Sequence, residues 1–276
     1  MRFRLAIIVF PALLARQATA QISVPQPGPV RYSDGVVRMI GGIPGALIPQ
    51  PAALGRAARI SFSNSAGLWA SPGEIRLVDA SLRTLASYPT DEEAPVLNTS
   101  GGPQTAAAWL PESHTLLTWT GKVFAAVEVD TSLFEGTVSS VSLTSAKTAR
   151  LFVADAKGVV SVVRIALPSG TVQSVDILPD VHGSAWSFGP LVISIAGREM
   201  ALDSPDGTRR MLLLADGALP KGGAVVAERM SDHWLHLRSV LDGREWALFM
   251  NGPDASIWQI PPVSSAAVIA GNGGAQ

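Results

Sequence analysis

Short runs in which apolar and polar residues alternate fill most of this chain, and helical periodicity is almost absent. The runs are interrupted about every ten residues by Gly, Pro, Asp or Asn, which is typical of half-buried strands joined by turns. The sequence therefore predicts an all-β fold. Strands are expected at residues 74–79, 122–129, 149–154, 159–167, 191–195, 233–240 and 245–250.

Two Asp-Gly pairs, Asp206-Gly207 and Asp242-Gly243, lie between apolar stretches and predict hairpin turns. Glycine adopts the positive φ that such turns need, and aspartate can accept hydrogen bonds within its own turn. The Gly-rich residues 41–45 are also expected to form a turn. Pro44 interrupts them and no helix start follows, whereas a phosphate-binding loop needs a helix N-terminus behind its glycines.

A small apolar strand recurs along the chain at nearly the spacing of a four-stranded propeller blade. Five such strands open at positions separated by 46, 35, 44 and 40 residues, and a blade takes roughly 40 to 50. Two further strands, at 30–32 and 36–40, have no opening strand of their own. This pattern predicts a β-propeller of about five to six four-stranded blades, and the irregular spacing leaves two packed β-sandwiches as the alternative. The opening residues are Ile60, Ala106, Val141, Ala185 and Val225.

The segment Ser204-Pro-Asp-Gly207 is a turn of the kind found in repeated propeller blades. With this turn and the repeat spacing, residues 30–262 resemble the bacterial exported β-propeller repeat proteins of the WD40-like and YVTN-like kind. The Gly-His and Trp-Asp dipeptides of WD40 blades are missing, and Arg209 and Arg210 stand where a sialidase-type Asp-box would have an aromatic residue. The resemblance implies a fold and no activity.

The N-terminus has the pattern of a secretory signal peptide. Arg2 and Arg4 precede an apolar run, and the small residues Ala18-Thr-Ala20 follow it. Pro11 and Arg16 make this run too short for the roughly 20 apolar residues of a membrane span. Cleavage after Ala20 is therefore expected, with a secreted or periplasmic product that has no membrane span.

Four parts of the chain follow from these patterns. Residues 1–20 are expected to be a signal peptide, 21–29 a Pro-rich N-terminal segment and 30–262 the propeller-like domain. Residues 263–276 form a C-terminal tail, in which an apolar stretch could supply a closing strand before a disordered end. We expect ring closure by pairing of strands from the two ends of the chain, because closed propellers expose no sheet edge.

Composition and spacing exclude several kinds of chemistry. The chain has no cysteine, which rules out thiolate metal sites and cysteine nucleophiles. His233 and His236 are three residues apart, so a strand would direct them to opposite faces. Removing residues 1–20 takes away three arginines and no acid, which changes the net charge from −1 to −4 and offers nothing to a phosphate backbone. We expect no metal, no cofactor and no nucleic-acid partner.

No Gly-x-Ser-x-Gly, Walker or His-Glu-x-x-His motif occurs, so catalytic and binding residues stay unassigned. This favours an exported, non-catalytic binding or scaffold module for an unknown protein or carbohydrate ligand. The alternative is an enzyme, a hydrolase or lyase, whose site in the central channel collects single residues from several blades. A channel lined by two or more acids and a histidine would favour the enzyme, and one lined by Ala, Val and Ser the module. Candidate acids are Asp79, Asp130, Asp155 and Asp203.

Other residue types could also contribute a site. His114 and His182 lie in turn-like stretches, where solvated histidines are common. The seven tryptophans could form a carbohydrate platform, although four of them lie inside apolar strands, where packing between sheets is the commoner role. Asn98-Thr-Ser100 matches a glycosylation acceptor. The four strand tryptophans are Trp69, Trp119, Trp234 and Trp246.

Overall fold

A computed structural model describes most of the predicted propeller domain. The described residues are 26–43, 45–101, 103–196, 199–205, 207–213, 225–251 and 254–262. The predicted signal peptide, residues 21–25 of the Pro-rich segment and the tail at 263–276 lie outside these ranges.

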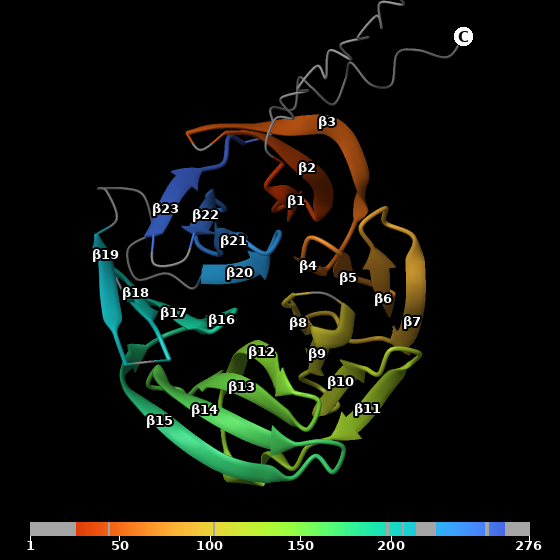
Figure 1. The fold of residues 1–276 in the computed structure, drawn as a ribbon, viewed down its shortest axis with the longest axis vertical. Coiled ribbons are helices and arrows are strands. Elements are labelled where there is room, and N and C mark those ends of the chain that lie inside the picture. The colour runs from red at the N-terminus through yellow and green to blue at the C-terminus, as the bar shows by residue number, and fades with distance from the viewer. Residues whose placement is uncertain are drawn as a thin grey trace, which may run out of the picture.

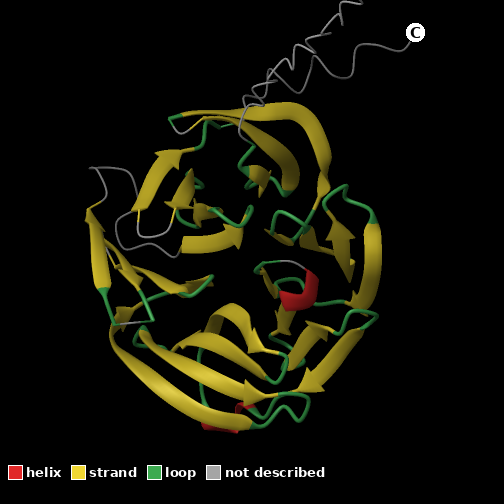
Figure 2. Ribbon diagram, viewed as in Figure 1, coloured by secondary structure: helices red, strands yellow, loops and turns green. Residues whose placement is uncertain are grey.

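The chain forms six antiparallel sheets arranged around a central channel, which makes a six-bladed β-propeller (Figure 1). Within the described residues, five sheets have four strands and the first has three, and strands follow one another in chain order within each blade. Almost all the regular structure is strand (Figure 2). The predicted fold is confirmed, and the alternative of two packed sandwiches is wrong.

The six blades are numbered in chain order. Blades 1 to 3 contain β1 (Gly28–Arg31), β2 (Val36–Ile43) and β3 (Ala46–Arg56); β4 (Arg59–Phe62), β5 (Ala66–Ser71), β6 (Gly73–Asp79) and β7 (Thr84–Thr90); and β8 (Val96–Thr99), β9 (Ala106–Leu110), β10 (Thr115–Trp119) and β11 (Phe124–Glu128). Blades 4 to 6 contain β12 (Thr137–Ser145), β13 (Thr148–Ala154), β14 (Val159–Ala166) and β15 (Val172–His182); β16 (Ala185–Phe188), β17 (Leu191–Ala196), β18 (Glu199–Asp203) and β19 (Arg209–Leu213); and β20 (Val225–Arg229), β21 (Trp234–Ser239), β22 (Glu245–Asn251) and β23 (Asp254–Gln259). Two short 3-10 helices, η1 (Pro103–Thr105) and η2 (Thr131–Leu133), accompany blade 3 and the connection to blade 4.

The predicted opening strands match the innermost strands of four blades, and the prediction for blade 3 is wrong. Ala106 opens β9, the second strand, because the true innermost strand is the short β8. Only four residues long and ending in Asn98 and Thr99, β8 lacks the apolar alternation that marks the other opening strands.

Apolar clusters fill the space between neighbouring blades. The described core separates into six clusters, one for each junction of the ring. Between blades 5 and 6, for example, Trp186 and Ile193 pack with Leu237 and Trp246. Alternation along each strand places one set of side chains on each face of the blade, so every blade contributes to two clusters.

Among the described residues, the strands at the two ends of the chain lie in different sheets; the closing strand expected in the tail at 263–276 lies outside these residues, so closure by strand pairing stays a prediction. β1 and β2 pair within blade 1, where β3 is the partner of β2, and β23 pairs with β22 within blade 6. Blades 1 and 6 instead pack face to face through Val30, Ile40 and Ala247, among others. Their backbones also come so close that a Cβ atom on Gly28 would lie 2.2 Å from the Met230 carbonyl oxygen.

Blade 1 contains the strands at 30–32 and 36–40, for which the sequence offered no opening strand. Gly41 and Gly42 belong to β2, and Ile43 pairs with Ala46 of β3; Pro44 of the predicted turn lies outside the described residues. The blade starts at Gly28, two residues before the predicted boundary at residue 30. Figure 1 shows β1 set back from the channel, whereas β4 and β20 approach its centre. Because β1 is set back, blade 1 does not contribute its first strand to the cavity described below.

Candidate functional site: the mouth of the central channel

A cavity of about 790 Å³ occupies one end of the channel. Its wall contains residues of β4, β8, β12, β16 and β20, the innermost strands of five blades, and none of β1. The cavity opens where these strands begin, beside the turn that joins β9 to β10. Its volume lies within the roughly 300 to 1,000 Å³ of small-molecule sites.

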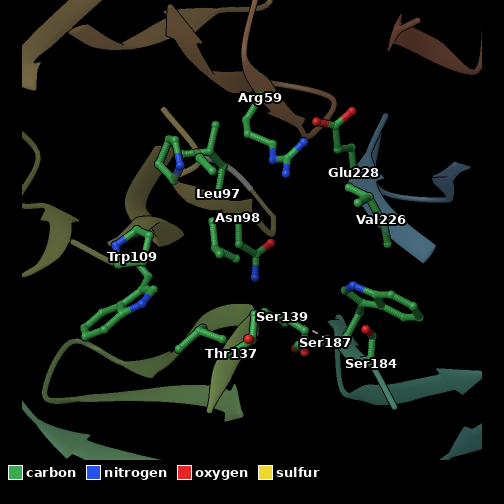
Figure 3. A pocket seen from close by; sticks show the side chains of 18 of the residues that line it. Arg59, Leu97, Asn98, Trp109, Thr137, Ser139, Ser184, Ser187, Val226 and Glu228 are labelled. Atoms are coloured by element: carbon green, nitrogen blue, oxygen red, sulfur yellow. Dashed lines mark hydrogen bonds between the residues drawn. The ribbon is translucent and has the colours of Figure 1, made fainter. Parts of the chain in front are cut away.

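One wall of the cavity is neutral and rich in hydroxyl groups (Figure 3). Ser139 Oγ donates to the Ala185 carbonyl at 2.7 Å, and Ser140 Oγ accepts from the Ser187 amide at 3.1 Å. Asn98 Nδ2 donates to the Val141 carbonyl at 2.6 Å. These bonds use polar groups of the innermost strands that have no strand partner on the channel side, and they tie blades 3, 4 and 5 together.

The opposite wall is charged, and its centre is Glu228 on β20. Glu228 Oε1 accepts from Arg31 Nε of blade 1 at 3.0 Å and from the Ile60 amide of blade 2 at 3.4 Å. Its other oxygen, Oε2, lies 3.6 Å from His236 Nδ1. A single buried carboxylate therefore joins blades 6, 1 and 2 at the point where the ring closes.

His236 continues this arrangement away from the channel. It lies directly opposite Glu228 in the β20–β21 pair, and its Nε2 is 3.6 Å from Glu245 Oε2. The other Glu245 oxygen accepts from the Ser33 amide at 2.9 Å. We call Arg31, Arg59, Glu228, His236, Arg238 and Glu245 the charged cluster.

In the charged cluster, burial and the neighbouring charges shift the pKa values of Glu228 and His236 in opposite directions. Burial by itself would lower the pKa of His236, but Glu228 and Glu245 flank the ring and together raise it. Burial would likewise raise the pKa of Glu228, but His236, Arg31 and Arg59 outweigh that effect and lower it. The structure thus favours an ionised carboxylate beside a protonated imidazole.

Arg59 is the member of the cluster that reaches the cavity together with Glu228. Figure 3 shows these two side chains on one wall, with Asn98 directed into the space below them. Burial lowers the pKa of Arg59, and the nearby charge of Glu228 counteracts this. Among the described residues, no hydrogen bond or ion pair engages the Arg59 guanidinium.

Blade 6 also contacts blade 5 through a charged group. The Arg229 guanidinium carbon lies 4.1 Å from the centre of the Phe188 ring, and burial lowers the pKa of Arg229 to about 10. A guanidinium over an aromatic face is attracted by the ring electrons. Arg229 therefore lines the channel as a largely enclosed cation.

The rim of the cavity carries His114, Thr131 and Glu135. His114 Nδ1 lies 3.3 Å from Thr131 Oγ1, and its ring stacks on Trp109 with a centroid distance of 6.3 Å. The φ of His114 is 51°, a left-handed conformation that is uncommon for residues other than glycine. Within the described ranges, no hydrogen bond or ion pair joins His114 to Glu135 or Glu228.

The four acids proposed for a channel site do not reach the cavity. Asp79 and Asp155 accept amide hydrogen bonds in hairpin turns, Asp130 caps η2, and Asp203 pairs with Arg209 at 2.7 Å. They lie at turns because aspartate readily accepts local backbone hydrogen bonds. The acids that do line the cavity are Glu135 and Glu228.

The histidine pair that the sequence singled out has two separate environments. His236 is 1% exposed between its two carboxylates, whereas the exposed His233 has Nδ1 3.2 Å from the Met250 carbonyl oxygen. His182 ends β15 and is exposed. In the part of the chain that the structure describes, no three histidine, aspartate or glutamate side chains are grouped so that they could hold a metal ion.

The tryptophans and the glycosylation motif also have clear positions. Trp69, Trp234 and Trp246 are buried between blades and Trp119 is half-buried, so their flat faces form no open platform. Asn98 is 5% exposed and its amide is bonded inside the channel, which makes it a poor glycosylation acceptor in the folded chain.

Sequence reasoning missed Arg59, Glu228 and the other members of the charged cluster except His236. A signal was present, because Glu228 and Arg229 follow directly on apolar residues of a predicted innermost strand. Charged residues are almost never fully buried unless they are paired. The partners of Glu228 on blades 1 and 2, Arg31 and the Ile60 amide, lie far away along the chain, so no local pattern could supply them.

Comparisons with known proteins give similarity of fold at low identity. No family model matches the sequence, and no curated protein matches it. The structure is similar to PorZ, an essential bacterial surface component of the type-IX secretion system of Porphyromonas gingivalis, with 11% identity, a TM-score of 0.45 and coverage of 88% of this chain. The match spans 39% of the PorZ chain, about two fifths of its length.

Two further solved structures are similar over most of both chains. A streptogramin B lyase has 11% identity and a TM-score of 0.46, with 87% of this chain and 86% of the lyase covered. Hydrazine synthase of Kuenenia stuttgartiensis has 10% identity and a TM-score of 0.43, with 84% and 80% covered. Across the described segments, no helix has the length and apolar character needed to cross a bilayer.

Proposed function

We propose that the mature chain is an exported, non-catalytic binding module whose ligand occupies the cavity at the mouth of the central channel. The observation that carries this proposal is a cavity of about 790 Å³ in which polar groups converge from five blades. Apolar walls with a few oriented polar groups are typical of small-molecule sites. Leu97 and Val226 supply apolar wall, and Arg59 and Asn98 supply polar groups.

The bonding of the cavity residues supports binding over catalysis. Glu228 is held by Arg31 and the Ile60 amide, and the nearby serines on the neutral wall are bonded to backbone groups. A general base or nucleophile must instead be free to reach the reacting atom. These residues therefore fix the shape of the cavity and leave Arg59 to contact a ligand.

Retention of a component from the exported fraction of the source cells tests the proposal. The immobilised chain should retain a component that Thr137→Trp loses, because a large side chain at this lining position fills the mouth. Thr144→Trp is the matched control, since Thr144 is also exposed on β12 but does not line the cavity. Equal retention by all three proteins, or none above a blank matrix, would contradict binding in the channel.

The second candidate is an enzyme, a hydrolase or lyase, with its site at the rim. The contact between His114 and Thr131, the left-handed backbone of His114 and the neighbouring Glu135 favour it. Two acids and a histidine do line the channel, together with Ala, Val and Ser residues. Conversion of the retained component by the chain, abolished in His114→Ala, would favour the enzyme; recovery of the component unchanged would favour the binding module.

A further inference from the structure

The charged cluster contains more positive than negative charge. Three guanidinium groups, on Arg31, Arg59 and Arg238, face two carboxylates, on Glu228 and Glu245. The excess is one positive charge with His236 neutral and two with His236 protonated, the form that the carboxylates favour. The cluster is largely buried, so water compensates this excess poorly.

Each of the two carboxylates has one oxygen that is hydrogen-bonded to a group other than Arg59. Glu228 Oε1 is shared between Arg31 Nε and the Ile60 amide, while both Glu228 Oε2 and Glu245 Oε2 face His236. Glu245 Oε1 accepts from the Ser33 amide. Among the described residues, Glu228 Oε2 and Glu245 Oε2 have no hydrogen-bond partner, and no ion pair joins either carboxylate to Arg59, although the charge of Glu228 acts on Arg59.

The wall that faces Arg59 carries no compensating charge. Ser139, Ser140 and Ser187 are neutral and already bonded to neighbouring strands. Thr137 and Ser184 line the same wall, and no bond of their hydroxyl groups to another described residue is formed. The remaining acid of the lining, Glu135, is exposed at the rim.

We propose that the mouth of the channel binds a small organic carboxylate, with the ligand's carboxylate on the Arg59 guanidinium and its body against Leu97 and Val226. This inference rests on the proposed function, because it assigns the chemical class of the ligand in the same cavity. Guanidinium and carboxylate match in geometry and form paired, charge-assisted hydrogen bonds. Hydroxyl groups on the ligand reach Thr137, Ser184 and the Asn98 side-chain oxygen.

A carboxylate fits this site better than a phosphate. The described lining has a single arginine at the mouth and no lysine, and Arg229 is enclosed against Phe188. Phosphate sites usually combine several cations or a helix N-terminus with free amides. Here one guanidinium faces neutral hydroxyl groups, which suits a single negative charge on an otherwise uncharged body.

Matched pairs of probes test the charge requirement directly. Glucuronate with glucose, and benzoate with benzyl alcohol, each differ by the carboxylate, and inorganic phosphate serves as the third anion. Binding is measured by ligand-observed NMR and calorimetry at low ionic strength, because salt screens the partly exposed pair. We expect at least one carboxylate to bind and its neutral counterpart to bind at least about tenfold more weakly.

Substitutions of Arg59 test whether the ligand's carboxylate binds to this residue. Arg59→Met should weaken carboxylate binding by about tenfold or more, and Arg59→Lys should weaken it less, because lysine keeps the charge without the planar fork. Arg164→Met is the matched control, since Arg164 is an exposed arginine on β14 outside the cavity. Far-ultraviolet circular dichroism spectra that match the wild type establish that the variants are folded.

The remaining outcomes distinguish a failure of the carboxylate inference from a failure of the proposed binding module. Carboxylate binding that Arg59→Met leaves unchanged, tighter binding of phosphate, or no carboxylate binding at all would overturn the carboxylate inference. If Thr137→Trp still abolishes binding of a neutral probe or of a retained component, the binding module stands while the carboxylate inference falls. If carboxylates bind equally to the wild type, Arg59→Met and Thr137→Trp, the channel site fails as well.

Discussion

At the innermost strands, blade 6 is joined to its neighbours by charged groups, whereas blades 2 to 5 are joined there by neutral ones. Glu228 connects blade 6 to blades 1 and 2, and Arg229 lies over Phe188 of blade 5. Between blades 2 and 3, by contrast, Ser61 Oγ lies 3.2 Å from Thr99 Oγ1 and accepts from the Thr99 amide at 3.0 Å. Hydroxyl groups connect the innermost strands of blades 2 and 3, whereas charged groups connect blade 6 to the blades on both of its sides.

We call the contacts of Glu228 with Arg31 and Ile60 the charged joint, and the contact between Ser61 and Thr99 the neutral joint. The two joints differ in what remains when one partner is removed. A hydroxyl pair leaves a neutral group unbonded, whereas a broken buried ion pair leaves an uncompensated charge in a poorly solvated place. The charged joint therefore makes the fold depend on blade 1, although β1 does not line the cavity. It also holds Arg59 beside the channel with an unbalanced positive charge.

The largest effect is expected from removing the first two strands. A variant that starts at Pro44 lacks β1 and β2, so it loses Arg31 and the apolar contacts of Val30 and Ile40 with blade 6. We expect the thermal midpoint to fall by at least about 10 °C and unfolding to become less cooperative. Removing residues 271–276 is the control, with little change expected. An unchanged midpoint in the first variant would show that blade 1 is an independent arm.

Glu228→Gln should have the next largest effect. It leaves Arg31 and His236 buried without their carboxylate, which should lower the free energy of unfolding by about 3 to 5 kcal/mol. Urea denaturation measures this change. Glu135→Gln, at an exposed rim position, should change the value by less than about 0.5 kcal/mol. Equal effects of the two substitutions would contradict the role of Glu228 in closure.

The charged joint should also respond to pH. The pKa of His236 is raised above its ordinary 6.5, so the protonated ring stabilises the fold fully below pH 6.5, and this contribution is lost as the pH rises through the folded-state pKa. The stability difference between wild type and His236→Gln should therefore shrink as the pH rises above 6.5. The other three histidines are common to both proteins and cancel. A difference that does not vary with pH would exclude a protonated His236.

The neutral joint should be weaker than the charged one. Ser61→Ala removes the acceptor of the buried Thr99 amide and should cost about 1 to 3 kcal/mol in the free energy of unfolding. Because no charge is left behind, the cost should vary little with pH or salt concentration. A loss as large as that of Glu228→Gln would remove the distinction between the two joints.

Most of the fold could be predicted from alternation, turn residues and repeat spacing, because these report local structure. The outermost strands β3, β7 and β15 were not assigned. They contain Pro49, Pro89 and Pro179. A proline in a sequence argues against a central strand, but an edge strand tolerates it, so these three strands were not predicted. The short β8 was missed because its four residues show no alternation.

The candidate site could not be predicted, and the reason is geometric. Arg31, Arg59 and Glu228 meet only because the ring brings the two ends of the chain together, and no spacing in the sequence records that contact. The predicted acids were at turns, where aspartate bonds to its own backbone. The acids that line the cavity are instead two glutamates, Glu135 and Glu228, on or beside innermost strands.

Paired double-mutant cycles at the two joints test the central claim most directly. One cycle combines Arg31→Met with Glu228→Gln, and the other combines Ser61→Ala with Thr99→Val; both use the free energy of unfolding in urea. Closure by a buried ion pair predicts a coupling above about 1.5 kcal/mol for the charged pair and about 1 kcal/mol or less for the hydroxyl pair. A charged-pair coupling equal to or below that of the hydroxyl pair would contradict closure of the ring through Glu228.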